Sequence, residues 1–158
     1  MFHVKRYPPL NKPLPSFLEA AGKTQPHPWG KGIGKTITFD VEPVAKPRMT
    51  RSDKWNKRPA TDRYWAYCDE MKYKANKERF TVPAELTVHF YLPMPESWPE
   101  RRKQAMEGQP HQSRPDLDNL LKAFKDALCP EDGYVHHYIN VRKLWARKGR
   151  IEVVLQGD

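Results

Sequence analysis

Apolar residues alternate with polar ones in three segments of the chain, as in strands that bury one face. These segments are residues 36–41, residues 86–92 and residues 150–155. A fourth strand is expected over residues 138–147, paired with the last strand as a hairpin around residues 148–149. The chain therefore contains a small β-sheet.

Apolar residues three and four positions apart predict two main helices. The first is expected from Thr61, as its cap, to about residue 77, and the second from Asp116 to Leu128, after Pro115. Their apolar faces hold Tyr64, Tyr67, Cys68, Met71 and Ala75 in the first helix and Leu117, Leu120, Leu121, Phe124 and Leu128 in the second. A short third helix should follow a capping box at residues 97–100. The prediction is an α+β fold: a mixed, mostly antiparallel sheet of about four strands with two main helices on one face.

The first 32 residues differ from the rest of the chain. They contain six prolines and only one short apolar patch, residues 17–21. Prolines at this density interrupt both helices and central strands. We therefore expect residues 1–32 to be an extended or disordered arm, and residues 33–158 to be one domain.

Charge limits the classes of function. The chain has 158 residues, a net charge of +9 and an isoelectric point near 9.6, which favours a polyanionic partner. It has two cysteines, no apolar run of the roughly 20 residues that span a bilayer, and no signal-peptide pattern at its start. These features predict a soluble, cytoplasmic protein that binds nucleic acid.

Acidic residues gather at the start of the second main helix. Asp116 and Asp118 are followed by Lys122, and the pair Glu131 and Asp132 comes after the helix. On a helix, Asp118 and Lys122 project at roughly 100° and 140° from Leu117, so they share a direction. Carboxylates are ligands for Mg²⁺, which keeps open positions for water and phosphate oxygens, and here a cation lies beside them. The arrangement indicates metal-assisted phosphodiester hydrolysis. Ordinary alternatives remain open: Asp116 as a helix cap, Asp118 as a partner of the helix dipole, and Lys122 as an ion-pair partner of Asp118.

The sequence Arg114-Pro-Asp-Leu-Asp-Asn-Leu-Leu-Lys122, followed by Asp126-Ala-Leu and Glu131-Asp132, resembles the signature of RusA-type Holliday junction resolvases. The resemblance extends over roughly residues 35–158. It implies a crossover junction endodeoxyribonuclease of recombination and repair, encoded by a bacterium or a phage. It also implies Mg²⁺ as cofactor, with Mn²⁺ as a substitute, held by Asp116, Asp118 and Asp132.

The same resemblance implies that Lys122 is an essential catalytic lysine and that Asp126 is a further acidic position without a clear role. Its substrate, a four-way junction, has two symmetric strands to be cut. A single small site per chain then implies a homodimer with twofold symmetry. The alternative from another class is a basic protein that binds branched DNA without cutting it.

Basic residues on either side of the acidic segment are candidates for phosphate contacts. Lys46 and Arg48 are the first choice, because a turn at Pro47 is expected to hold both away from the fold. Arg51 and Arg114 are further candidates, and so is the basic cluster of residues 142–150. His111 is expected to be a solvated loop residue.

Overall fold

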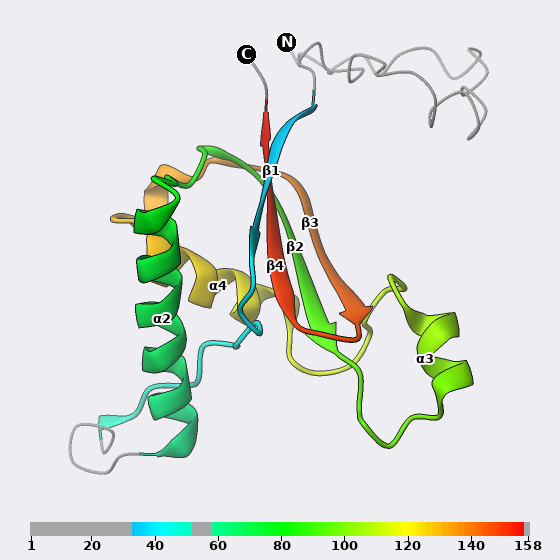
Figure 1. Cartoon of the computed structure of the whole chain (residues 1–158). Helices are drawn as coiled ribbons and strands as arrows, with labels where there is room; N and C mark the ends of the chain where they lie inside the picture. The colour runs from blue at the N-terminus through cyan, green and yellow to red at the C-terminus, as the bar shows by residue number, and fades with distance from the viewer. Residues whose placement is uncertain (1–32, 52–57, 157–158) are drawn as a thin grey trace, which may run out of the picture.

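The computed structural model describes residues 33–51 and 58–156, of which Ile33, Gly34, Asp132 and Gln156 are described by their backbone alone. These residues form four strands, three α-helices and one 3-10 helix (Figure 1). The elements are β1 (Ile33–Phe39), α2 (Pro59–Lys77), β2 (Glu85–Pro93), α3 (Glu100–Met106), α4 (Leu117–Leu128), the 3-10 helix η2 (Asp132–Tyr134), β3 (His137–Ala146) and β4 (Arg150–Gln156). The arm predicted at residues 1–32 lies outside the described residues.

The four described strands form one mixed sheet in the order β1-β4-β2-β3. β4 pairs antiparallel with β1 and β2, whereas β2 and β3 run parallel. The expected hairpin of β3 and β4 is therefore wrong, because β2 lies between them. Residues 147–149 cross the end of β2, and three residues can span the roughly 10 Å between alternate strands. Burial agrees with this order: Ile151 and Val153 of β4 are fully buried, as in a central strand, whereas β3 has buried residues only at its end, Trp145 and Ala146, as at an edge.

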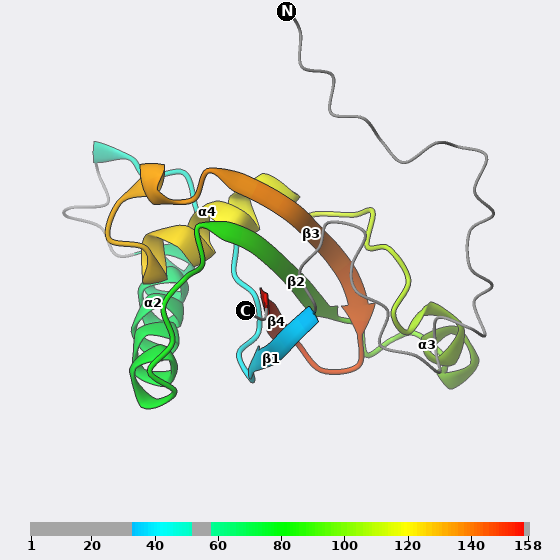
Figure 2. The same ribbon diagram turned by 90° about the horizontal axis from the view of Figure 1, so that it is seen from above.

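Helices α2 and α4 pack on one face of the sheet, whereas α3 stands apart beside its edge (Figure 2). The core fills the space between these two helices and the sheet. For example, Phe90 of β2 and Phe124 of α4 meet edge to face, with ring centroids 6.1 Å apart. No residue of α3 is buried. The mixed sheet and the two helices on one face confirm the predicted α+β fold.

The two main helices confirm the predicted helical faces. All five residues predicted for the buried face of α2 are buried, and so are Leu120 and Phe124 of α4. α2 begins at Pro59 rather than at the expected cap Thr61, because proline suits the first turn of a helix. The capping box expected before α3 is not formed, since Pro99 takes the N-cap position. Within the described ranges, none of the helices has the length and apolar character needed to cross a membrane.

Candidate functional site

Asp116 and Asp118 lie at the N-terminal end of α4. Asp116 is the N-cap residue, with φ −69° and ψ 141°, but its carboxylate accepts no capping hydrogen bond from the helix. Asp118 lies in the first turn, and both side chains are exposed. The capping alternative for Asp116 is therefore not observed. The oxygens of both carboxylates remain available to an external ligand, at the helix end whose N–H groups favour anionic groups.

Lys122 lies one helical turn beyond Asp118 and is exposed. The structure contains no ion pair between these two side chains, so the alternative left open by the sequence is not observed. Among the described residues, Lys122 has no hydrogen-bond or ion-pair partner. Its amine is therefore not held by another group of the described part of the chain.

Lys143 of β3 fixes the loop that leads into α4. Its Nζ donates to the carbonyl oxygens of Ser113, at 2.5 Å, and Pro115, at 2.7 Å. Pro115 immediately precedes Asp116, so this contact sets the backbone position of the first aspartate. The sequence assigned Lys143 only to a basic cluster. No local pattern could identify this role, since its partners are 28 and 30 residues away.

His111 supports the same loop from inside the protein. Its side chain is only 6% exposed, so the expected solvated histidine is wrong. The imidazole packs against Trp145 with ring centroids 3.8 Å apart and the rings tilted by 35°, and its Nδ1 accepts a hydrogen bond from the backbone N–H of Ser113. Burial, and to a smaller extent the charge of Lys143, lowers the pKa of His111. The aromatic contact explains why this polar residue is buried.

Lys46 ties the loop between β1 and α2 to α4. Its Nζ forms an ion pair with Asp126, and its backbone N–H donates to the carbonyl of Asn119 at 3.1 Å. The Tyr64 hydroxyl lies 3.4 Å from the same Asp126 oxygen. The expectation that Pro47 holds Lys46 away from the fold is therefore wrong. Asp126, whose role the motif left open, anchors this loop beside Asn119 and thus beside the aspartate pair.

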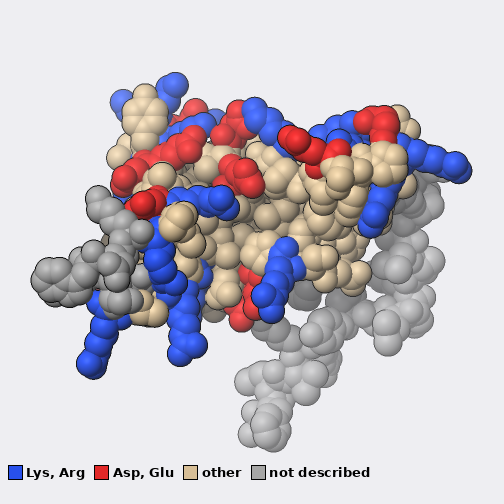
Figure 3. Space-filling view, turned by 90° about the horizontal axis from the view of Figure 1, so that it is seen from below, with Lys and Arg blue, Asp and Glu red and all other residues tan. Residues whose placement is uncertain are grey.

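The other predicted DNA contacts, Arg48, Arg51 and Arg114, are exposed. Lys and Arg side chains project from the face shown in Figure 3, with acidic groups between them. In the basic cluster at residues 142–150, Arg142 bonds to Asn140, Arg147 to Glu100, Lys148 to Asp40 and Arg150 to Glu152. These four side chains have partners within the protein, so the three exposed arginines are better placed to contact phosphate.

Asp132 lies at the other end of α4 from the aspartate pair. Its backbone belongs to η2, which follows the C-terminal end of the helix. Lys125, near that end, donates to Tyr138 at the start of β3, whereas Lys143 further along β3 reaches the residues before α4. The helix and β3 therefore run in opposite directions, and 12 helical residues extend about 18 Å. The structure does not bring the backbone of Asp132 to the pair, and its side chain is outside the description.

Asp116 and Asp118 are the residues that would contribute carboxylates to a hard cation at this end of α4. Among the described side chains, no group of three or more His, Cys, Asp or Glu residues is arranged to hold a metal. Mg²⁺ is commonly bound by one or two carboxylates, with water and phosphate oxygens as its remaining ligands. Asp116 and Asp118 supply two such carboxylates, both exposed, and that of Asp116 is not used as a helix cap.

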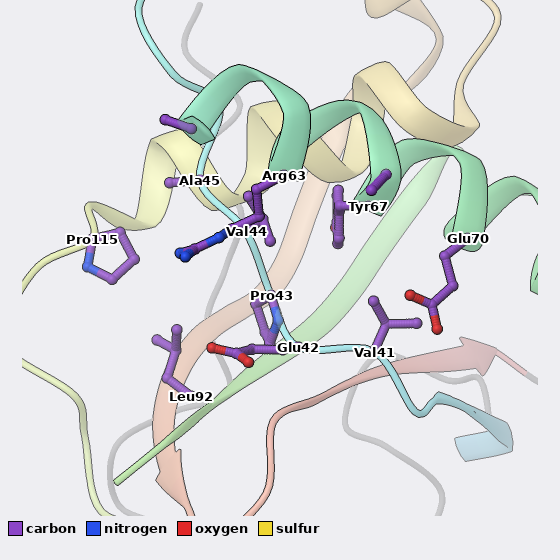
Figure 4. Close-up of a pocket in the computed structure, with 12 residues that line it drawn as sticks. Val41, Glu42, Pro43, Val44, Ala45, Arg63, Tyr67, Glu70, Leu92 and Pro115 are labelled. Carbon is purple, nitrogen blue, oxygen red and sulfur yellow. The ribbon is translucent and has the colours of Figure 1, made fainter. Parts of the chain in front are cut away.

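A cavity of about 640 Å³ opens between α2 and the segment that follows β1. Pro115 and Leu92 form one end of its lining, and Arg63 extends into it from α2 (Figure 4). Because Pro115 precedes Asp116, the cavity adjoins the aspartate pair. No sequence pattern marks this cavity, because its walls come from segments far apart in the chain.

Comparison with known proteins identifies the family of the chain. Residues 40–156 match the family model described as Endodeoxyribonuclease RusA. The match covers most of the chain, including the aspartate pair and every described helix. A search of the curated proteins finds no match. The chain therefore belongs to the RusA endodeoxyribonuclease family, the Holliday junction resolvases whose motif its residues 114–122 resemble.

Proposed function

We propose that this protein is a divalent-metal-dependent endonuclease that resolves four-way DNA junctions in recombination and repair. One observation carries the proposal: Asp116 and Asp118 present two exposed carboxylates at the start of a helix, in a chain of the RusA family. The family match supports nuclease activity on DNA. The junction substrate and the metal follow from the motif and from the chemistry of the pair.

Asp116 and Asp118 are the residues that would hold Mg²⁺, with Mn²⁺ as a substitute. The bound ion would supply a Lewis acid for the scissile phosphate and a water of lowered pKa. Lys122 places a fixed positive charge one turn away, where it can stabilise the charge that develops on the phosphate. Lys143 holds the carbonyl of Pro115 and thereby fixes the position of Asp116.

Arg48, Arg51 and Arg114 are proposed to contact the phosphates on either side of the cut. Phosphate contacts fix the register of a protein on DNA without reading its sequence. The ion pair of Lys46 with Asp126 holds the loop that carries Arg48 against α4. In this proposal Lys46 positions the DNA-binding loop, in addition to any contact of its own with phosphate.

A junction requires two symmetric cuts, so we propose a homodimer with one site in each subunit. The third carboxylate, Asp132, is proposed from the motif alone. Since the length of α4 separates its backbone from the aspartate pair, Asp132→Asn should not weaken metal binding at that pair. A loss of cleavage as large as that of Asp118→Asn would support a catalytic role for Asp132, and normal cleavage would exclude it.

The decisive experiment compares a synthetic four-way junction with a linear duplex of the same sequence in the presence of Mg²⁺. We expect paired nicks near the branch point and no cutting of the duplex. Asp118→Asn keeps the size of the side chain but removes a charge that the metal needs, so cleavage should fall at least about 10²-fold. Junction binding should persist or tighten, because repulsion between carboxylate and phosphate is relieved.

Near-normal cleavage by pure Asp118→Asn would overturn the metal-site assignment. Wild-type protein that binds junctions selectively but never cuts them would instead support the alternative function, a junction-binding protein without catalysis.

A further inference from the structure

The cavity beside the aspartate pair contains polar groups that the proposed cleavage mechanism does not use. Arg63 extends into it and has no hydrogen-bond or ion-pair partner among the described residues (Figure 4). Tyr67 also lines it; its side chain is only 3% exposed and its hydroxyl has no hydrogen-bond partner. Burial raises the pKa of Tyr67, so this hydroxyl stays neutral and can both donate and accept. A buried polar group without a partner indicates that something else completes the site.

The walls of the cavity restrict the class of ligand. Val44, Ala45 and Leu92 give it an apolar lining, and Glu42 and Glu70 add two carboxylates. A phosphate would be repelled by these carboxylates and poorly solvated by apolar walls. A nucleobase suits both, because its faces are apolar and its exocyclic amino group can donate to a carboxylate. A guanidinium group can also stack on a base or donate to its acceptor atoms.

We propose that this cavity receives one unpaired nucleobase of the branched DNA, next to the phosphate that is cut. The inference rests on the proposed function, which supplies DNA with unpaired or weakly stacked bases at its branch point. Moving a base out of the stack costs least where it is already unpaired. Pro115 belongs to the cavity wall and Asp116 to the metal site, so the base and the scissile phosphate come from neighbouring nucleotides.

Removing single bases from the DNA tests this assignment. Junctions carrying one abasic site at each position within two nucleotides of the cut are titrated against the full-length Asp118→Asn protein, which binds without cutting. Two variants are made in that background: Arg63→Ala removes the cation, and Ala66→Phe fills the cavity from an exposed position of α2. Lys72→Ala is the control, because it removes one exposed charge from the same helix outside the cavity lining.

We expect one abasic position to weaken binding by the parent and by Lys72→Ala about tenfold or more, the usual effect of losing one held base. Arg63→Ala and Ala66→Phe should bind intact junctions more weakly and lose most of that sensitivity. If one variant fails to fold, the other still decides the outcome. The base pocket would be overturned if every abasic junction bound as tightly as the intact one, or if a folded cavity variant were still weakened by the same abasic site. Either result would leave the proposed nuclease function standing. A parent protein with no preference for junctions over linear duplex would overturn both proposals.

Discussion

The ion pair of Lys46 and Asp126 should stabilise the domain more than a typical surface pair. The two side chains are 33% and 21% exposed, and Asp126 keeps only the long contact with Tyr64 when Lys46 is removed. Fully exposed pairs contribute about 0.2–1 kcal/mol, and a half-buried charge left without its partner costs more. We therefore expect Lys46→Met and Asp126→Asn each to lower the free energy of unfolding by about 1–2 kcal/mol, with a coupling of about 1 kcal/mol between them.

Urea unfolding of the wild type, the two single variants and the double variant measures this coupling. A loss of 1 kcal/mol moves the midpoint by about 0.3–1 M urea, which is readily resolved. The pair of Lys148 and Asp40 provides a matched control, because its side chains are 80% and 60% exposed and lie 3.1 Å apart. Its coupling should be below about 0.5 kcal/mol and should decline further with added salt.

The same variants separate the two roles of Lys46. If Lys46 contacts phosphate, Lys46→Met should reduce the slope of log binding constant against log salt concentration by about one, and Asp126→Asn should leave that slope unchanged. If it only anchors the loop, both substitutions should weaken binding without changing the salt dependence. A coupling no larger than that of Lys148 with Asp40 would show that the loop is not anchored in this way.

Three further predictions follow from the site and its surroundings. Lys122→Met should cost at most about 0.5 kcal/mol of stability but slow turnover about 10²-fold or more, and extra Mg²⁺ should not restore it; cleavage at the wild-type rate would refute the catalytic role. Deleting residues 1–32 should preserve folding and Mg²⁺-dependent cleavage, since the family match begins at residue 40; an insoluble or newly monomeric product would contradict this. Because the pKa of His111 is lowered in the folded state, unfolded chains bind more protons as pH falls below about 6.5. The wild type should therefore lose more unfolding free energy between pH 7 and pH 5 than His111→Gln does, and parallel losses would show that His111 does not titrate in this way.

The helices and strands were predictable because their signal is local. The apolar residues of α4 recur every three or four positions, and those of β2 every second position. The conformation of each segment can therefore be predicted from its own residues. The order of the strands is not local information. Residues 148–149 resemble a hairpin turn, yet β4 lies between β1 and β2, where its Ile151 and Val153 are buried on the side of the helices.

The residues of the proposed site also divide into those that local sequence predicts and those that it does not. Asp116, Asp118 and Lys122 lie within two turns of one helix, so their spacing alone places them together. Lys143 acts on the same site through carbonyl groups that no sequence pattern marks. The proposed grouping of Asp132 with the pair assumed that a short connection returns toward the start of the helix. Instead η2 leads on into β3 from the far end of α4.

Helix α4 links the proposed steps of binding and cleavage. The backbone N–H of Lys46 is bonded to Asn119, the residue after Asp118, and its side chain is paired with Asp126 two turns further along. Arg48 therefore lies two residues from a point fixed relative to the aspartate pair, rather than at the end of an independent loop. A phosphate contact sets the register of DNA on a protein, so if Arg48 binds phosphate as proposed, this attachment decides which phosphate reaches Asp118. If the proposed mechanism holds, a substitution at Asp126, in the last turn of α4, should alter cleavage without changing a residue of the proposed metal site.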